Sequence, residues 1–97
     1  MDVRLTITEH KNKMIKIIDG FEDYYQWNYL QWDVRELASS HKILGILILT
    51  FKKIESMEKS IEYFEENDLM EIFQLELEEV KIITEFYYDK LVTKKEA

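Results

Sequence analysis

Apolar residues recur at steps of three and four along most of this chain, which is the spacing of one face of an α-helix. In the first segment this stripe consists of Met14, Ile18, Phe21, Tyr25 and Trp32. In the second it consists of Leu44, Leu47, Phe51, Ile54, Met57, Ile61 and Phe64. In the third it consists of Leu69, Ile72, Phe73, Val80, Ile83, Tyr87 and Leu91. The pattern predicts three long helices.

The expected start of the first helix rests on a capping motif. Thr6 and Glu9 have the spacing of a capping box, so this helix is expected to begin near Thr6 or Thr8. The chain has no proline, and the apolar stripe keeps its phase across Gly20. We therefore expect the first helix to run unbroken to Ala38, with a break near Gly20 as the alternative.

Capping residues also mark the two later boundaries. Ser39 and Ser40 are favourable N-caps, so the second helix is expected to begin after them. Asn67 and Asp68 are expected to end it, and Asp68 with Glu71 has the spacing of a second capping box that opens the third helix.

Short connections between long helices favour antiparallel neighbours. The predicted fold is therefore all-α, an antiparallel bundle of three long helices within a single domain of residues 1–97, with completion by dimerisation as a further option. Residues 43–51 are apolar nearly all round, which is typical of a helix at the centre of a bundle. Val3, Leu5 and Ile7 alternate with polar residues, so a short strand over residues 3–7 stays open as an alternative.

Composition narrows the class of protein. A hydrophobic fraction of 46% is too high for intrinsic disorder. The absence of cysteine excludes disulfides, thiolate metal sites and cysteine nucleophiles. The N-terminal residues lack the pattern of a signal peptide, and the longest apolar stretch is far short of the ~20 residues that span a bilayer. These features lead us to expect a cytoplasmic protein with no membrane partner.

The net charge of −7 is concentrated late in the chain. Residues 60–80 contain eight acidic residues and no lysine or arginine. One interpretation is a solvated helix face, and the other is a patch that binds a basic protein surface, including that of a nucleic-acid-binding protein. Direct binding of this chain to nucleic acid is disfavoured, because phosphate contacts need a basic stripe. The predicted partner-binding acids are Glu62, Glu65, Glu66, Asp68 and Glu71.

Six of the twelve residues between Phe21 and Trp32 are aromatic. Tyr24, Trp27 and Tyr29 fall off the apolar stripe of the first helix, and tyrosine and tryptophan are enriched at binding hot spots. We expect these three to contribute to a partner site, with a homodimer interface as an equally good explanation.

Catalytic and metal-binding patterns are sparse. The two histidines, His10 and His41, have neither Glu-x-x-His nor His-x-x-x-His spacing, and there is no glycine-rich phosphate loop. The sequence therefore predicts neither a metal site nor a cofactor.

One short motif is similar to a known family. Arg35 and His41, in the sequence Arg-Glu-Leu-Ala-Ser-Ser-His, resemble the Arg-x(4-6)-His motif of the HEPN ribonucleases, which are small helical proteins that often form a composite site by dimerising. The resemblance implies His41 as the acid/base and Arg35 as the group that stabilises phosphate charge, across a break between two helices.

The favoured hypothesis is a small, acidic, non-enzymatic interaction protein that occludes a partner's surface, as a phage-type inhibitor, an antitoxin or an immunity protein does. The alternative is the HEPN-like ribonuclease with a composite Arg35/His41 site in a dimer.

Overall fold

The computed structural model describes the backbone of residues 2–28 and 33–93 and the side chains of residues 2–23 and 33–92. Within these ranges the chain forms the helices α1 (Val3–Asn28), α2 (Val34–Glu66) and α3 (Met70–Tyr88), followed by a short π-helical segment, Asp89–Thr93. The predicted all-α bundle of three helices is therefore confirmed for the described residues.

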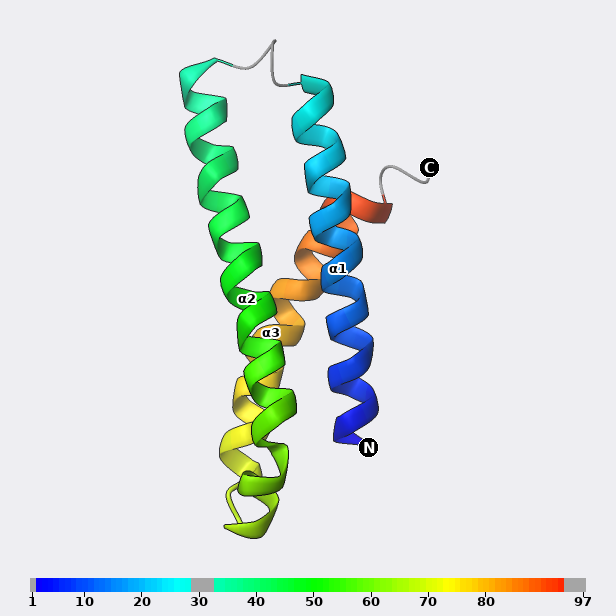
Figure 1. Cartoon of the computed structure of the whole chain (residues 1–97), viewed down its shortest axis with the longest axis vertical. Coiled ribbons are helices and arrows are strands. Elements are labelled where there is room, and N and C mark those ends of the chain that lie inside the picture. The colour runs from blue at the N-terminus through cyan, green and yellow to red at the C-terminus, as the bar shows by residue number, and fades with distance from the viewer. Residues whose placement is uncertain (1, 29–32, 94–97) are drawn as a thin grey trace.

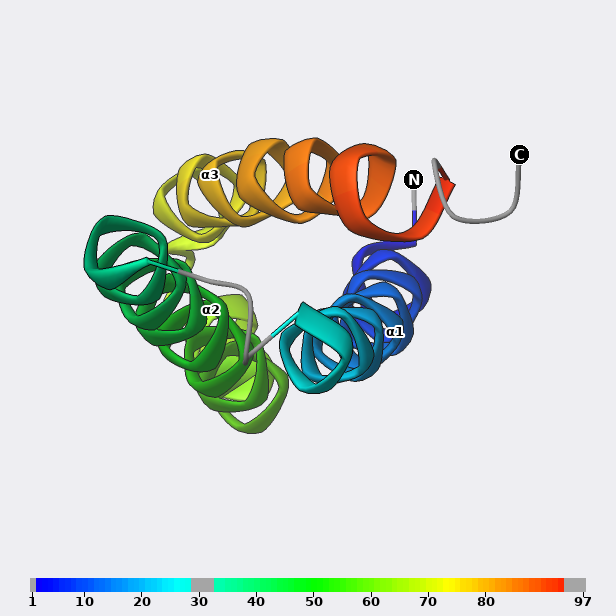
Figure 2. The same ribbon diagram turned by 90° about the horizontal axis from the view of Figure 1, so that it is seen from above.

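The helices pack as an elongated bundle with principal extents of 51 × 27 × 17 Å. Figure 1 shows α1 and α2 running antiparallel, with α3 crossing diagonally behind them from the end of α2 toward α1. Seen from above, the helices surround a common core (Figure 2). At 19 residues, α3 is much shorter than the 33-residue α2, so it covers only part of the α1–α2 pair.

Each helix contributes one apolar stripe to this core, as the periodicity predicts. The buried hydrophobic residues are Ile7, Met14, Ile17, Phe21, Leu47, Ile54, Met57, Ile61, Phe73, Leu77 and Val80. Ile18, Leu44, Phe51 and Phe64 pack against them while partly exposed. The expected continuity of the first helix across Gly20 is confirmed, since Gly20 lies inside α1.

The predicted start of the first helix is wrong. α1 begins at Val3, and the Asp2 carboxylate accepts hydrogen bonds from the backbone N–H groups of Arg4 (2.9 Å) and Leu5 (3.4 Å). Thr6 is buried inside the helix, so it does not cap it. The alternative of a strand over residues 3–7 is also wrong. These residues lie in α1, and the burial of Thr6, Ile7 and His10 follows the helical period.

The predicted boundary at Ser39 and Ser40 is also wrong. α2 begins at Val34, and its N-cap Asp33 forms a capping box with Glu36. The Asp33 carboxylate accepts from the Glu36 N–H at 2.9 Å, and the Glu36 carboxylate accepts from the Asp33 N–H at 3.3 Å. These reciprocal bonds satisfy two backbone N–H groups at the start of α2. Because α2 begins at Val34, the first helix does not extend to Ala38.

The turn between α2 and α3 differs from the predicted capping box. Asp68 has a φ of 58°, in the left-handed region, and the N-cap of α3 is Leu69, which makes no side-chain cap bond. The Leu69 N–H donates to the Phe64 carbonyl at 2.8 Å, and the Asp68 N–H donates to the Glu65 carbonyl at 3.4 Å. This pair of bonds is a Schellman motif that closes α2. The expected end of the second helix at Asn67 and Asp68 is therefore confirmed, whereas the expected capping box of Asp68 at the start of α3 is wrong.

Residues 43–51 are not buried all round, as the expected position at the centre of the bundle would require. Leu47 is fully buried, but Leu49 is 69% exposed. α3 moves away from α2 and ends beside α1, so it does not cover this half of α2 (Figures 1 and 2).

Candidate protein-binding surface

The predicted acidic residues meet at one end of the bundle. Glu62, Glu65 and Glu66 lie in the last turns of α2, Asp68 lies in the turn, and Glu71 lies in the first turn of α3. All five are exposed, and we call this group the acidic end. It surrounds the α2–α3 turn at the bottom of Figure 1. Here the structure brings together the acids that the sequence singled out.

Charge neutralisation at the acidic end is slight. The Arg4 guanidinium of α1 lies 2.9 Å from the Glu65 carboxylate, and both side chains are largely exposed. Arg4 offsets one of the five carboxylate charges, and an exposed pair of this kind contributes only about 0.2–1 kcal/mol to stability. The acidic end therefore keeps a strongly negative character, which attracts a cationic surface.

The predicted aromatic residues fall outside the described side chains. For Tyr24 and Trp27 the structure describes only the backbone, which is part of α1, and Tyr29 lies outside the described residues altogether. Their contribution to a partner site stays a prediction. Phe21, the first residue of the aromatic run, is buried in the core as its place in the stripe indicates.

An exposed apolar surface that the sequence analysis missed lies on α3. We call it the α3 outer stripe, and its residues are Ile72, Leu75, Ile82 and Phe86. Steps of three, seven and four residues place them on one side of the helix, opposite the buried Phe73, Leu77 and Val80. The expected core position of Ile72 is therefore wrong. Because α3 is apolar on two faces, periodicity alone did not show which face packs inward.

Acidic side chains border the α3 outer stripe. Between Asp68 and Lys90 the sequence has seven carboxylates and two lysines. Lys81 lies 3.3 Å from Glu78, and Lys53 of α2 lies 3.3 Å from Glu79. The Lys90 ammonium lies 5.7 Å from the centre of the Phe86 ring, within the range of a cation–π interaction. The surface thus combines exposed apolar side chains with an excess of negative charge.

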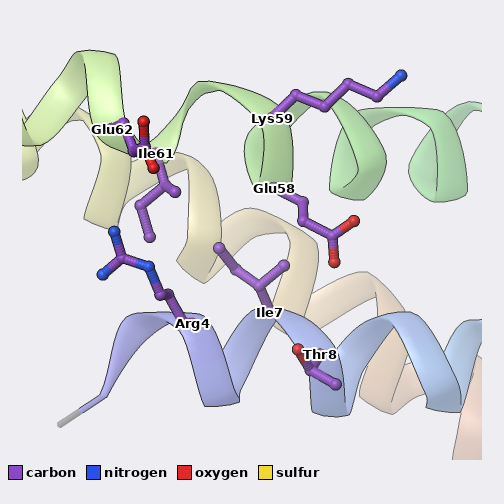
Figure 3. A pocket seen from close by; sticks show the side chains of 7 residues that line it. All are labelled: Arg4, Ile7, Thr8, Glu58, Lys59, Ile61 and Glu62. Atoms are coloured by element: carbon purple, nitrogen blue, oxygen red, sulfur yellow. The ribbon is translucent and has the colours of Figure 1, made fainter.

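A shallow groove between α1 and α2 has a different character. Figure 3 shows Ile7 and Ile61 pointing toward each other across it, with Arg4 and Glu58 beside them and the Lys59 ammonium extending away. Its charged neighbours link the two helices, since Arg4 pairs with Glu65 and Lys11 lies 3.1 Å from Glu58. The groove is therefore the polar margin of the α1–α2 interface, and its side chains do not form a nucleophile and base pair.

Arg35 and His41 do not lie across a break between helices, as the ribonuclease resemblance implied. Both are exposed on α2, near its N-terminal end. Six residues correspond to about 600° of helical rotation, so the two side chains leave the helix in directions about 120° apart. RNA cleavage stays a prediction, and an assay of the purified chain beside its His41→Ala variant tests it.

His10 is a buried polar group, only 3% exposed, between α1 and α3. Its Nδ1 donates a hydrogen bond to the Thr6 carbonyl at 2.8 Å, and its Nε2 lies 3.8 Å from the Glu85 carboxylate. Among the side chains that the structure describes, no group of three or more potential ligands could hold a metal ion. The burial of His10 beside Glu85 makes it part of the packing between α1 and α3.

No helix among the described residues is long and apolar enough to cross a membrane. Comparisons with protein-family models, with curated proteins and with solved structures give no match.

Proposed function

We propose that this chain is a small non-enzymatic protein-binding module, which occupies a basic surface of a protein partner through its acidic end. The observation that carries the proposal is the gathering of five exposed carboxylates around the α2–α3 turn, next to the exposed side chains of Tyr63 and Ile72. Complementary charge speeds association and fixes orientation, while apolar and aromatic contacts supply affinity.

The same arrangement supports occlusion rather than catalysis. An acidic surface that covers a cationic site blocks access of phosphate-bearing ligands to that site, because both compete for the same lysines and arginines. Phage-type inhibitors, antitoxins and immunity proteins are the classes of protein that act in this way. We propose this mode of action for the chain and assign the chain to none of these classes.

The experiment compares wild type with a Glu62→Gln/Glu66→Gln/Glu71→Gln variant. This variant keeps Glu65 because it pairs with Arg4, and it keeps Asp68 because its backbone is left-handed. The matched control is Asp19→Asn/Glu22→Gln/Asp23→Asn, which removes the same charge from exposed positions of α1. Each tagged protein is used to recover partners from cells that encode the chain, and the dissociation constant of the purified partner is then measured at two salt concentrations.

We expect the α2–α3 variant to weaken binding about tenfold at low salt, since three exposed charge contacts are worth roughly 1–3 kcal/mol together. The α1 control should bind like wild type. Equal binding by all three proteins, or a loss confined to the α1 variant, would contradict the proposal.

A further inference from the structure

The α3 outer stripe is an apolar helix face that no described element covers. Leu75 is 70% exposed and Ile82 is 69% exposed, and Ile72 and Phe86 extend the stripe at either end. In Figure 2, α1 and α2 lie on the same side of α3, so the opposite side of this helix faces away from both. A helix that is apolar on two opposite faces normally packs against neighbours on both.

The geometry of the stripe matches a second helix. From Ile72 to Phe86 it extends about 20 Å along the axis at roughly 1.5 Å per residue, which is four turns. Its side chains lie three, seven and four residues apart, which is the heptad spacing of a helix-packing seam with its central position occupied by Glu79. A partner helix of similar length would cover all four residues.

The charge around the stripe selects the chemistry of that helix. Glu71 and Glu78 lie on one margin, and Glu79 lies within the stripe between Leu75 and Ile82. All three are exposed, although Glu78 pairs with Lys81 and Glu79 with Lys53, each at 3.3 Å. Glu79 also lies midway between Ile72 and Phe86, so a two-fold antiparallel pairing of α3 with a second copy would bring two Glu79 carboxylates together. Like charges facing each other oppose such pairing, whereas lysines or arginines beside an apolar seam would complement the margin.

We infer that the α3 outer stripe docks a basic amphipathic helix of the protein partner. This inference rests on the proposed function and adds the structural element that the partner presents. It also assigns an apolar share of the affinity to α3.

The probe is a fluorescent peptide of about 20 residues, long enough to form a helix, with leucine at the a and d heptad positions and lysine elsewhere. A second peptide carries glutamate in place of lysine. The test variant is Leu75→Gln/Ile82→Gln. Its matched control is Leu5→Gln/Leu49→Gln, because Leu5 and Leu49 are 68% and 69% exposed on other helices. Circular dichroism checks that each variant keeps its helical content.

We expect the lysine peptide to bind wild type and the Leu5/Leu49 control equally, and the Leu75/Ile82 variant at least tenfold more weakly. The glutamate peptide should not bind. Failure of the lysine peptide to bind wild type, or equal weakening by both double variants, would overturn the inference. So would a wild-type dimer in light scattering that the Leu75/Ile82 variant abolishes, because a second copy would then cover the stripe.

The outcomes also separate this inference from the proposed function. A natural partner that depends on Glu62, Glu66 and Glu71 but tolerates Leu75→Gln/Ile82→Gln would overturn the inference and leave the proposed function standing. A partner that depends on neither set would overturn both.

Discussion

Gly20 in the middle of α1 faces the backbone carbonyl of Leu91, and a Cβ built at Gly20 would lie 3.2 Å from that oxygen. The π-helical segment after α3 thus approaches α1 more closely than most side chains would allow. This contact explains why a glycine, which costs a helix interior about 1 kcal/mol relative to alanine, stands inside a long helix. Gly45 in α2 has no such neighbour within 4 Å of its built Cβ.

The two glycines should therefore respond differently to alanine. We expect Gly45→Ala to raise the free energy of unfolding by about 0.5–1 kcal/mol, because it gains helix propensity in open space. Gly20→Ala gains the same propensity but must displace a backbone carbonyl, so its net gain should be smaller or negative. Urea denaturation of both variants measures the difference, and an equal gain at both positions would show that the Leu91 contact is not tight.

Replacing Asp68 with glycine should stabilise the folded chain. The φ of 58° at Asp68 places a non-glycine residue at the left-handed position of a Schellman motif, where glycine is preferred. We expect Asp68→Gly to stabilise the chain by about 0.5–1 kcal/mol and Asp68→Ala to destabilise it. Asp68→Asn removes the charge but tolerates the left-handed backbone, so it isolates the electrostatic share. Thermal unfolding of the three variants should rank glycine above asparagine and asparagine above alanine.

The start of α2 at Asp33 can be tested against the boundary that the sequence suggested. Asp33→Ala removes the carboxylate that accepts from the Glu36 N–H, while the bond from its own N–H to the Glu36 carboxylate can remain, and it should cost about 1 kcal/mol of unfolding free energy. Ser39 lies inside α2 and is exposed, so Ser39→Ala should be neutral or stabilising by a few tenths of a kcal/mol. A loss of about 1 kcal/mol at Ser39, with no effect at Asp33, would restore the boundary predicted from sequence.

Thr84 is fully buried on α3, and its hydroxyl has no hydrogen-bond partner among the described residues. Thr84→Val keeps the shape and removes an unpaired polar group, so we expect stabilisation of about 1 kcal/mol. Thr50 is the matched control, because its hydroxyl donates to the Ile46 carbonyl at 2.7 Å. Thr50→Val should change the unfolding free energy by less than about 0.5 kcal/mol. Destabilisation by Thr84→Val would show that its hydroxyl is satisfied in solution.

Helix identity could be predicted from this sequence because each stripe repeats over several turns. Leu47, Ile54, Met57 and Ile61 occupy such positions in α2, and all four are buried. The helix ends could not be placed as well, because a capping residue acts through a single bond. Thr6 matches a capping pattern, yet its burial against the core outweighs that local preference.

The candidate surface was foreseen only in part. The acids of the acidic end are near one another in sequence, so a turn at Asn67 was enough to bring them together. The α3 outer stripe was missed because α3 carries apolar residues on two faces. Which face turns inward depends on how α3 crosses α1 and α2, and that is a tertiary property.

Binding of a basic helix to the acidic helical surface centred on α3 can be tested with a single titration. The isotope-labelled wild-type chain is titrated with the leucine–lysine peptide while amide chemical shifts are recorded by nuclear magnetic resonance. We expect the largest changes on residues 72–86 and on the acidic end. Changes concentrated in α1, including residues 24–28, would contradict this expectation.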